Sequence, residues 1–269
     1  MDVSTATNAT APIRNALPCL RALAQMAAPK KGFLKLQIHD AENGLDVTLS
    51  GRSRPGESDV RRWTNHALEA GFLRLNIDDE ILIERERPIT LMDTIEVCLP
   101  PGAFSQATRT AQQSMMDLVK VHLKKCKFIA DLFCGAGTFA LPLAKQSKVY
   151  AAEFHAPSLT AMDRAWREAR GLKPLKWERR DLFRTPLLTR ELKVFDGLVF
   201  DPPRAGAEAQ AAHIAKSTVK YVAAISCNPS TFARDARILM DGGYRLQKVT
   251  PVDQFFYSPH IEVVGLFVK

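Results

Sequence analysis

The chain has 269 residues, 46% of them hydrophobic, which is enough for one large domain or two smaller domains with buried cores. No run approaches the roughly 20 consecutive apolar residues of a membrane-spanning helix, and the start, MDVSTATNATAP, lacks the pattern of a secretory signal. The formal net charge of +8 favours a nucleic-acid partner, although solvated helix faces would explain the scattered basic residues equally well. We therefore expect a cytoplasmic protein without a membrane partner.

The cysteines are spread along the chain without a CxxC pair. This spacing argues against a zinc ribbon and against the disulfide framework of a small secreted protein. Each cysteine is first interpreted as a free thiol, which is usually buried. The five positions are Cys19, Cys98, Cys126, Cys134 and Cys227.

The first hundred residues predict a small α+β domain over 12–100, built mainly from antiparallel strands, after a disordered segment at 1–11. A helix fits 12–27, and Asp59 is placed to cap a short helix over 59–70. Alternating apolar residues around turns predict two β-hairpins and a further strand. The expected strands are FLKLQIHD, LDVTLSG, LRLNI, ILIE and TIEVCLP.

After PPGAF at 100–104 the pattern changes to short apolar runs that alternate with helical stretches, beginning with a helix over 107–124. Such alternation is typical of a doubly wound α/β sheet. We therefore expect a seven-stranded Rossmann-like domain over 101–269. Its predicted strands cover residues 128–133, 148–153, 175–179, 194–201, 221–226, 244–252 and 262–268.

The segment 128–144, FIADLFCGAGTFALPLA, places a glycine turn between a strand ending at Asp131 and a helix. Gly135 and Gly137 would let the backbone approach a ligand closely, where a Cβ atom would collide. A GxG pair alone is weak evidence, but its position between strand and helix favours a cofactor site at this turn.

Acidic residues occur at the ends of the next strands: Glu153, Asp181 and Asp201. Open α/β sheets bind ligands at the carboxyl ends of their strands, where Glu153 would suit the ribose hydroxyls of an adenosine cofactor and Asp181 an adenine amine. Taken singly, each acid could instead cap the following helix. A nicotinamide cofactor is the main rival, but Asp201 followed by two prolines fits S-adenosylmethionine better.

Two further residues reach the same end of the predicted sheet: Cys227 after the fifth strand and Glu262 at the last strand. A thiol and a carboxylate facing the cofactor suggest covalent methylation of a pyrimidine. Carbon 5 of uracil is a poor nucleophile until a thiolate adds to carbon 6, and a base must then remove the carbon-5 proton. Cysteine suits the first task and a desolvated glutamate the second.

The motifs DLFCGAGTF, DPPRAGA, SCNP and the closing HIE segment resemble, in the same order, the uracil-5 RNA methyltransferases that act on tRNA and rRNA. The resemblance is close over 100–269 and weaker over 12–99. It implies S-adenosylmethionine as the cofactor and a uridine in rRNA or tRNA as the substrate. Under it, Cys227 is the nucleophile, Glu262 the base, and Asp201 binds cofactor or holds the uracil.

The same resemblance implies that Gln106 contacts the methionine end of the cofactor. His260 lies two residues before Glu262 and either orients it or is a structural histidine. The remaining residues that match the cofactor site are Phe133, Gly135, Gly137, Thr138, Glu153 and Asp181. The aromatic residues that either stack on an extruded uracil or belong to the core are Phe104, Phe255, Phe256 and Tyr257.

The chain departs from the family pattern at its beginning. Members usually start with a small RNA-binding β-barrel, and many continue with a cysteine cluster that holds an iron–sulfur centre. Cys19 matches the last cluster ligand, but its three partners are absent, and one thiolate cannot hold such a centre. We therefore expect no iron–sulfur cluster in this chain, which is either a truncated form or a member that lost these parts. We also expect a monomer.

Three alternatives stay open. Cytosine-5 RNA methyltransferases resemble this mechanism but usually carry a cysteine where Arg204 follows the two prolines. Amino-group methyltransferases have an aromatic residue at that position. A non-catalytic fragment that binds RNA or S-adenosylmethionine is the third alternative, and the set of Cys227, Glu262 and Asp201 argues against it.

Overall fold

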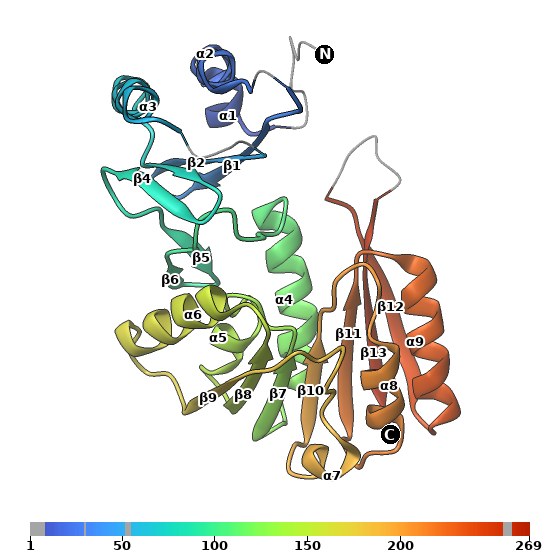
Figure 1. Cartoon of the computed structure of the whole chain (residues 1–269). Helices are drawn as coiled ribbons and strands as arrows, with labels where there is room; N and C mark the ends of the chain where they lie inside the picture. Colours follow the sequence, from blue (N-terminus) through green and yellow to red (C-terminus); the bar gives the residue numbers. More distant parts are fainter. Residues whose placement is uncertain (1–8, 30, 52–54, 255–259) are drawn as a thin grey trace. The chain divides into compact units, whose positions relative to one another are not determined.

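The computed structural model describes residues 9–29, 31–51, 55–254 and 260–269. The chain divides into two compact units (Figure 1). The first unit comprises the residues up to Leu91 and Cys98–Ser105, and the second comprises Met92–Val97 and Gln106–Lys269. The sequence predicted a domain boundary near residue 100. The structure instead assigns Met92–Val97 to the second unit, because the short strand β6 (Ile95–Val97) packs on a helix of that unit. Another short strand, β5 (Thr90–Met92), precedes it.

The first unit is a four-stranded sheet with helices on one face. Apolar side chains of the helices and of the sheet form its core, in which Leu23, Val47, Trp63 and Leu75 are completely buried. The helices are α1 (Ala11–Asn15), α2 (Leu17–Ala27) and α3 (Glu57–Glu69). The strands, in sheet order, are β1 (Lys35–Ala41), β2 (Gly44–Ser50), β3 (Arg74–Ile77) and β4 (Glu80–Glu84).

Two helix predictions for this unit were wrong in detail. The single helix expected over 12–27 is two helices, because Pro18 lies in the first turn of α2, where its missing N–H is tolerated. Asp59 does not cap α3, which begins two residues earlier after Gly56, and instead pairs with Arg62 at 3.0 Å. Helix α1 also begins at Ala11, inside the segment expected to be disordered; residues 1–8 of that segment lie outside the described residues.

The sheet of the first unit is mixed rather than antiparallel. β1 with β2 and β3 with β4 are the two antiparallel hairpins that the sequence predicts, but β2 and β3 run parallel. The connection through α3 explains this, because a helical crossover returns the chain to the same end of the sheet.

A buried polar network ties the sheet of the first unit to the segment that follows it. The Arg74 guanidinium donates to both carboxylate oxygens of Asp46, at 3.0 and 2.6 Å, and to the Leu99 carbonyl at 2.8 Å. The Asn76 amide donates to Asp46 at 2.9 Å and to Thr48 at 3.0 Å. One member is not fully paired, because the side-chain carbonyl oxygen of Asn76 has no hydrogen-bond partner among the described residues.

The second unit is a seven-stranded sheet in the order β12-β13-β11-β10-β7-β8-β9, which confirms the predicted Rossmann-like class. The run from β11 to β9 is parallel, whereas β13 is antiparallel to both β11 and β12. All seven predicted strands are present: β7 (Phe128–Leu132), β8 (Lys148–Glu153), β9 (Leu175–Arg179), β10 (Gly197–Phe200), β11 (Tyr221–Ser226), β12 (Arg245–Val252) and β13 (Glu262–Val268).

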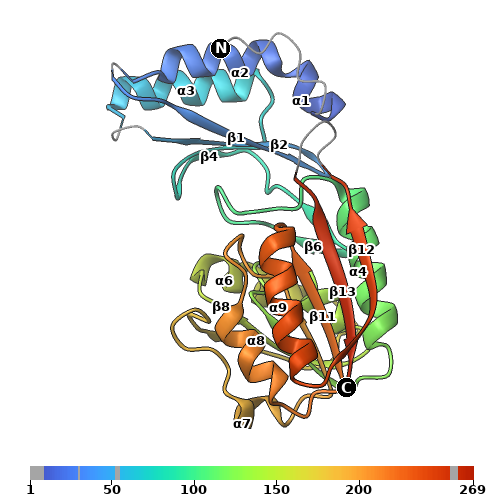
Figure 2. The ribbon, with the colours of Figure 1, turned by 90° about the vertical axis from the view of Figure 1, so that its right-hand side faces the viewer.

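Helices cover both faces of this sheet, and α4 and α9 lie on opposite faces of β11 and β13 (Figure 2). Gly265 of β13 lets α9 approach, since a Cβ there would lie 2.5 Å from the buried Phe232 ring. None of the described helices is long and apolar enough to cross a membrane. The helices of this unit are α4 (Arg109–Leu123), α5 (Ala140–Leu143), α6 (Ala156–Glu168), α7 (Thr189–Leu192), α8 (Glu208–Ala215) and α9 (Pro229–Asp241).

The strand order reverses between β7 and β10, because β8 and β9 extend the sheet on one side and β10 starts the other. Ligands of doubly wound sheets bind at such a switch point, outside the carboxyl ends of the strands. Asp131 near the end of β7 and Asp201 after β10 mark this position. The antiparallel pairing of Ser226 with Val263 brings the start of β13 to the same edge.

Candidate cofactor and catalytic site

The turn after β7 uses positive φ angles at Phe133 (61°), Gly135 (53°) and Gly137 (93°). A Cβ on Gly135 would meet nothing within 4 Å, so the backbone borders open space there. A Cβ on Gly137 would lie 2.8 Å from Met162 and 2.9 Å from Leu141. Gly135 therefore suits the expected approach of a ligand, whereas packing and backbone conformation account for glycine at 137.

Glu153 ties the end of β8 to the glycine turn. One carboxylate oxygen accepts the Gly135 N–H at 3.1 Å, and the other accepts the N–H groups of Phe154 and His155, both at 2.8 Å. Each carboxylate oxygen has two lone-pair sites, so the oxygen that faces Gly135 can still accept a hydrogen bond from a hydroxyl. The arrangement is compatible with both the capping and the ribose-binding interpretation of Glu153.

Asp181 and two exposed aromatic residues, Phe154 and Phe183, lie just after the carboxyl ends of β8 and β9. The Asp181 carboxylate accepts the N–H groups of Phe183 at 3.0 Å and Arg184 at 3.2 Å. The Phe183 ring is 49% exposed and lies 5.4 Å from the Phe133 ring, and Phe154, next to Glu153, is 57% exposed. Phe154 and Phe183 were not among the predicted site residues. The sequence signal for them was an aromatic residue one or two positions after a strand-end acid.

Asp131 is fully buried, and neither of its carboxylate oxygens has a hydrogen-bond partner among the described residues. Burial, together with the neighbouring charges of Asp201 and Glu153, raises the pKa of Asp131 well above its usual range. Such surroundings disfavour the charged form of a carboxyl group.

Asp201 is the acid of the DPPR motif at the end of β10. Burial and the charge of Glu262 raise the pKa of Asp201 to about 7. Near neutral pH its carboxyl group therefore exists in both protonation states and can either donate or accept a hydrogen bond. The ionised form could accept a hydrogen bond from an N–H group of a ligand, and the protonated form could donate one to a C=O group.

The segment after Asp201 is held against the start of α9. The Arg204 carbonyl accepts hydrogen bonds from the Asn228 amide at 3.3 Å and the Thr231 hydroxyl at 3.4 Å. Further along, the buried Asp235 carboxylate accepts the Ala207 N–H at 2.7 Å. These bonds fix the DPPRAGA loop relative to the start of α9, two residues after the predicted nucleophile Cys227.

Cys227 is half-buried between the end of β11 and the first turn of α9. The Asn228 side chain caps the helix by accepting the Ser230 N–H at 3.0 Å. Burial, then the charges of Glu262 and Asp201, raise the pKa of the Cys227 thiol, while the Arg204 guanidinium lowers it. A helix start favours an anion, which assists formation of a thiolate at Cys227.

Glu262 opens β13 and is 4% exposed. Its carboxylate accepts a hydrogen bond from the Gln254 amide at 3.0 Å. Burial raises the pKa of Glu262, and the Gln254 bond opposes that rise. Because the charge of Glu262 acts on both Asp201 and Cys227, the structure brings the three predicted catalytic residues together at one edge of the sheet.

Gln106 joins this group through Gln254, a residue the sequence analysis missed. The Gln254 amide donates to the Gln106 side-chain carbonyl at 3.1 Å, and its own carbonyl accepts the Ala107 N–H at 3.1 Å. The available signal was a polar residue just before an aromatic run in the sequence, two residues after the end of β12.

The other predicted residues are less closely tied to this edge. Thr138 is half-buried in the turn before α5, His260 is exposed, and Phe104 is exposed in the first unit. The Cys19 carbonyl accepts a hydrogen bond from the His66 ring at 2.8 Å. The described residues include no group of three or more His, Cys, Asp or Glu side chains arranged for a metal. The remaining aromatic candidates, Phe255, Phe256 and Tyr257, lie outside the described residues.

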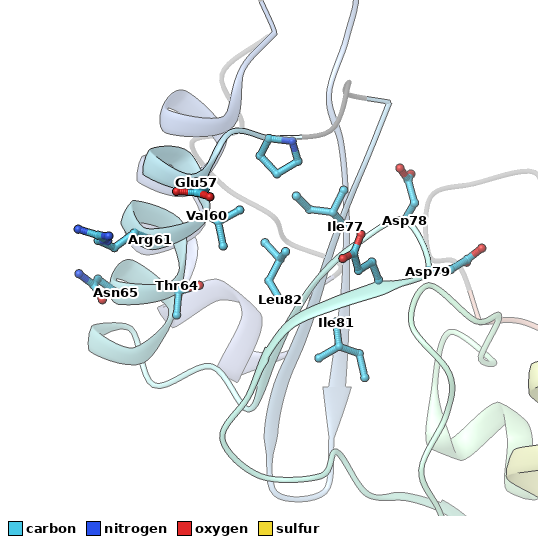
Figure 3. Close-up of a pocket in the computed structure, with 12 residues that line it drawn as sticks. Glu57, Val60, Arg61, Thr64, Asn65, Ile77, Asp78, Asp79, Ile81 and Leu82 are labelled. Atoms are coloured by element: carbon cyan, nitrogen blue, oxygen red, sulfur yellow. The ribbon is translucent and has the colours of Figure 1, made fainter.

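The first unit has a separate open groove of about 1140 Å³ between α3 and the β3–β4 hairpin (Figure 3). Its lining combines apolar with mainly acidic side chains, and it contains none of the predicted site residues. The lining includes Val60, Ile77, Ile81 and Leu82 with Glu57, Arg61, Asp78 and Asp79.

Comparison with known proteins gives consistent matches. Residues 175–269 match the family model of tRNA (uracil-5-)-methyltransferases. A protein of Mesorhizobium japonicum named as an uncharacterized RNA methyltransferase is 51% identical over 94% of this chain and 62% of its own length. The 23S rRNA (uracil(1939)-C(5))-methyltransferase RlmD of Photobacterium profundum is 29% identical over 94% of this chain and 56% of its own length.

Among solved structures, the tRNA (uracil-54, C5)-methyltransferase of Pyrococcus abyssi, in complex with S-adenosyl-L-homocysteine, has the same fold. Its TM-score is 0.74 at 21% identity, over 95% of this chain and 66% of that chain. The present chain spans about three fifths of the length of the curated relatives that it matches. These matches, with the motifs at the strand ends, make the chain similar to RNA methyltransferases, and its residues 175–269 to the uracil-5 family in particular.

Proposed function

We propose that this chain transfers the methyl group of S-adenosylmethionine to carbon 5 of a uridine in RNA, through a covalent bond between Cys227 and carbon 6. The observation that carries the proposal is that Cys227, Asp201 and Glu262 lie together at one edge of the sheet, where the two carboxyl groups raise the pKa of the thiol. The names of two similar proteins, one acting on 23S rRNA and one on tRNA, support rRNA or tRNA as the substrate class.

The residues at the strand ends fit the cofactor. Gly135 borders open space, Glu153 has acceptor sites for ribose hydroxyls, and the exposed ring of Phe183 provides a surface for adenine. Gln106 would contact the methionine end, with Phe133, Gly137, Thr138 and Asp181 completing the site. The bound cofactor supplies the methyl group that the activated carbon 5 accepts.

The protein side chains supply the remaining steps. The Cys227 thiolate adds to carbon 6, and the electrons of the 5,6 double bond make carbon 5 nucleophilic. Asp201 holds the uracil ring through a hydrogen bond. After methyl transfer, the Glu262 carboxylate takes the carbon-5 proton; the electrons of that C–H bond restore the double bond, and the bond between sulfur and carbon 6 breaks. The thiolate is then regenerated.

RNA that carries 5-fluorouracil tests this mechanism, because fluorine replaces the proton that Glu262 must remove and the adduct is trapped. Wild-type protein with S-adenosylmethionine should form a complex that survives denaturing electrophoresis. Cys227→Ser should not, and Cys126→Ser, which alters a buried thiol away from the strand ends, should behave like the wild type. Absence of the complex in the wild type, or its presence in Cys227→Ser, would contradict the proposal.

The alternative to be tested is a chain that binds S-adenosylmethionine or RNA without catalysing methyl transfer. Binding of S-adenosylhomocysteine in calorimetry, combined with no adduct and no methyl incorporation into unmodified rRNA or tRNA transcripts, would favour this candidate.

A further inference from the structure

Gln254 occupies a buried position between two residues of the proposed site. It is 5% exposed and lies two residues after the end of β12. Its amide group donates to Glu262 at 3.0 Å and to Gln106 at 3.1 Å, and its carbonyl accepts the Ala107 N–H at 3.1 Å. Both amide protons and the carbonyl of this side chain are therefore used.

The orientation of the Gln254 amide follows from its partners. A backbone N–H can only donate, so the end of the amide that faces Ala107 must be the carbonyl. The NH₂ group then faces Glu262 and Gln106. As the Gln106 carbonyl accepts from Gln254, the NH₂ group of Gln106 is left to face a ligand acceptor, such as a carboxylate.

We infer that Gln254 is a positioning residue that orients the Glu262 carboxylate and sets the direction of the Gln106 amide. This inference rests on the proposed function, in which Glu262 is the base and Gln106 contacts the cofactor. A hydrogen bond donated to a carboxylate favours its charged form, so the bond from Gln254 opposes the rise in the pKa of Glu262 that burial causes. Gln254 therefore links the Glu262 carboxylate to the cofactor side of the site.

Gln210 provides a matched control. It is equally buried, at 1% exposure, and uses its amide in the same way, but both of its hydrogen bonds go to the Leu187 backbone, at 2.8 and 3.1 Å. Methionine has nearly the shape of glutamine without its hydrogen-bonding groups. Gln254→Met and Gln210→Met should therefore lose similar stability, while only the first alters the proposed site.

The first measurement is the pKa of Glu262, from NMR titration of protein with ¹³C-labelled glutamate carboxyl groups. The Glu262 resonance is identified by its loss in Glu262→Gln. Its midpoint should move to higher pH in Gln254→Met and further in Gln254→Glu, which adds a like charge. The Gln210→Met midpoint should equal that of the wild type. An unchanged midpoint in Gln254→Met, or an equal change in Gln210→Met, would overturn the inference.

The second measurement is the affinity for S-adenosylhomocysteine by calorimetry. Loss of one oriented, charge-assisted hydrogen bond should weaken binding about tenfold in Gln254→Met and leave Gln210→Met unchanged. Equal affinities in the two variants would overturn the inference that Gln254 sets the direction of the Gln106 amide. Neither measurement requires RNA or turnover, so failure of the 5-fluorouracil adduct would reject the proposed function without deciding the role of Gln254.

Discussion

Asp201 and Glu262 belong to strands separated by β11, yet the charge of Glu262 raises the pKa of Asp201. Cys227 follows that intervening strand, and both carboxyl groups raise its pKa as well. The protonation of the two carboxyl groups therefore affects how readily the Cys227 thiolate forms.

Asp201→Asn should remove a pH dependence of stability. The pKa of Asp201 rises from 3.8 to about 7 on folding, so the folded state binds more protons between these values. Its stabilising contribution is fully present below pH 4 and is lost as the pH rises through 7. Urea unfolding of the wild type should show this loss, whereas Asp201→Asn should be more stable than the wild type at pH 8. Parallel pH profiles for the two proteins would contradict the prediction.

Glu262→Gln should separate formation of the adduct from its release. The amide keeps the shape of the side chain but cannot take the carbon-5 proton, so turnover should fall roughly 100- to 10,000-fold. Methyl incorporation and adduct accumulation on uridine-containing transcripts measure the two steps. Turnover equal to that of the wild type would remove Glu262 from the role of base.

The two glycines of the turn should respond differently to alanine. Gly137→Ala forces a Cβ against Met162 and Leu141 and should cost about 1–3 kcal/mol of unfolding free energy from overpacking alone. Gly135→Ala meets no atom and should cost only about 1–2 kcal/mol, from its left-handed conformation. Urea unfolding measures both. The Gly135 variant should in addition weaken binding of S-adenosylhomocysteine, because its Cβ enters the open space; unchanged binding would contradict that role.

Breaking the buried pair of Asp46 and Arg74 should destabilise the first unit. Asp46→Ala leaves the buried Arg74 guanidinium with only the more distant, more exposed carboxylate of Glu84, at 3.6 Å, and should cost about 3–5 kcal/mol. Replacing both residues, as Asp46→Leu with Arg74→Met, should recover part of this loss because no buried charge remains. Chemical unfolding of the single and double variants gives the comparison, and a double variant less stable than Asp46→Ala would show that the pair is needed for more than charge balance.

Local sequence patterns were sufficient for most of the fold. Most strands of the second unit carry an apolar run, whereas β9 and β12 are largely polar, and all seven strand predictions are confirmed. The errors lie in the first unit, at Pro18, Asp59 and the parallel pairing of β2 with β3. Parallel or antiparallel pairing depends on where a connection crosses the sheet, which periodicity within a strand does not encode.

The motifs by themselves determined the family resemblance and the residue types of the site, since a glycine turn, strand-end acids, a cysteine and a glutamate each reflect a chemical requirement. Only the tertiary structure decided which of these groups act on one another. The register of β13 against β11 sets Glu262 beside Cys227 and Asp201, and the packing around Gln254 connects Glu262 with Gln106 across 156 positions of chain, from 106 to 262. Burial and electrostatic coupling depend on distances through space, so the altered pKa values of Asp201 and Cys227 arise only in the folded protein.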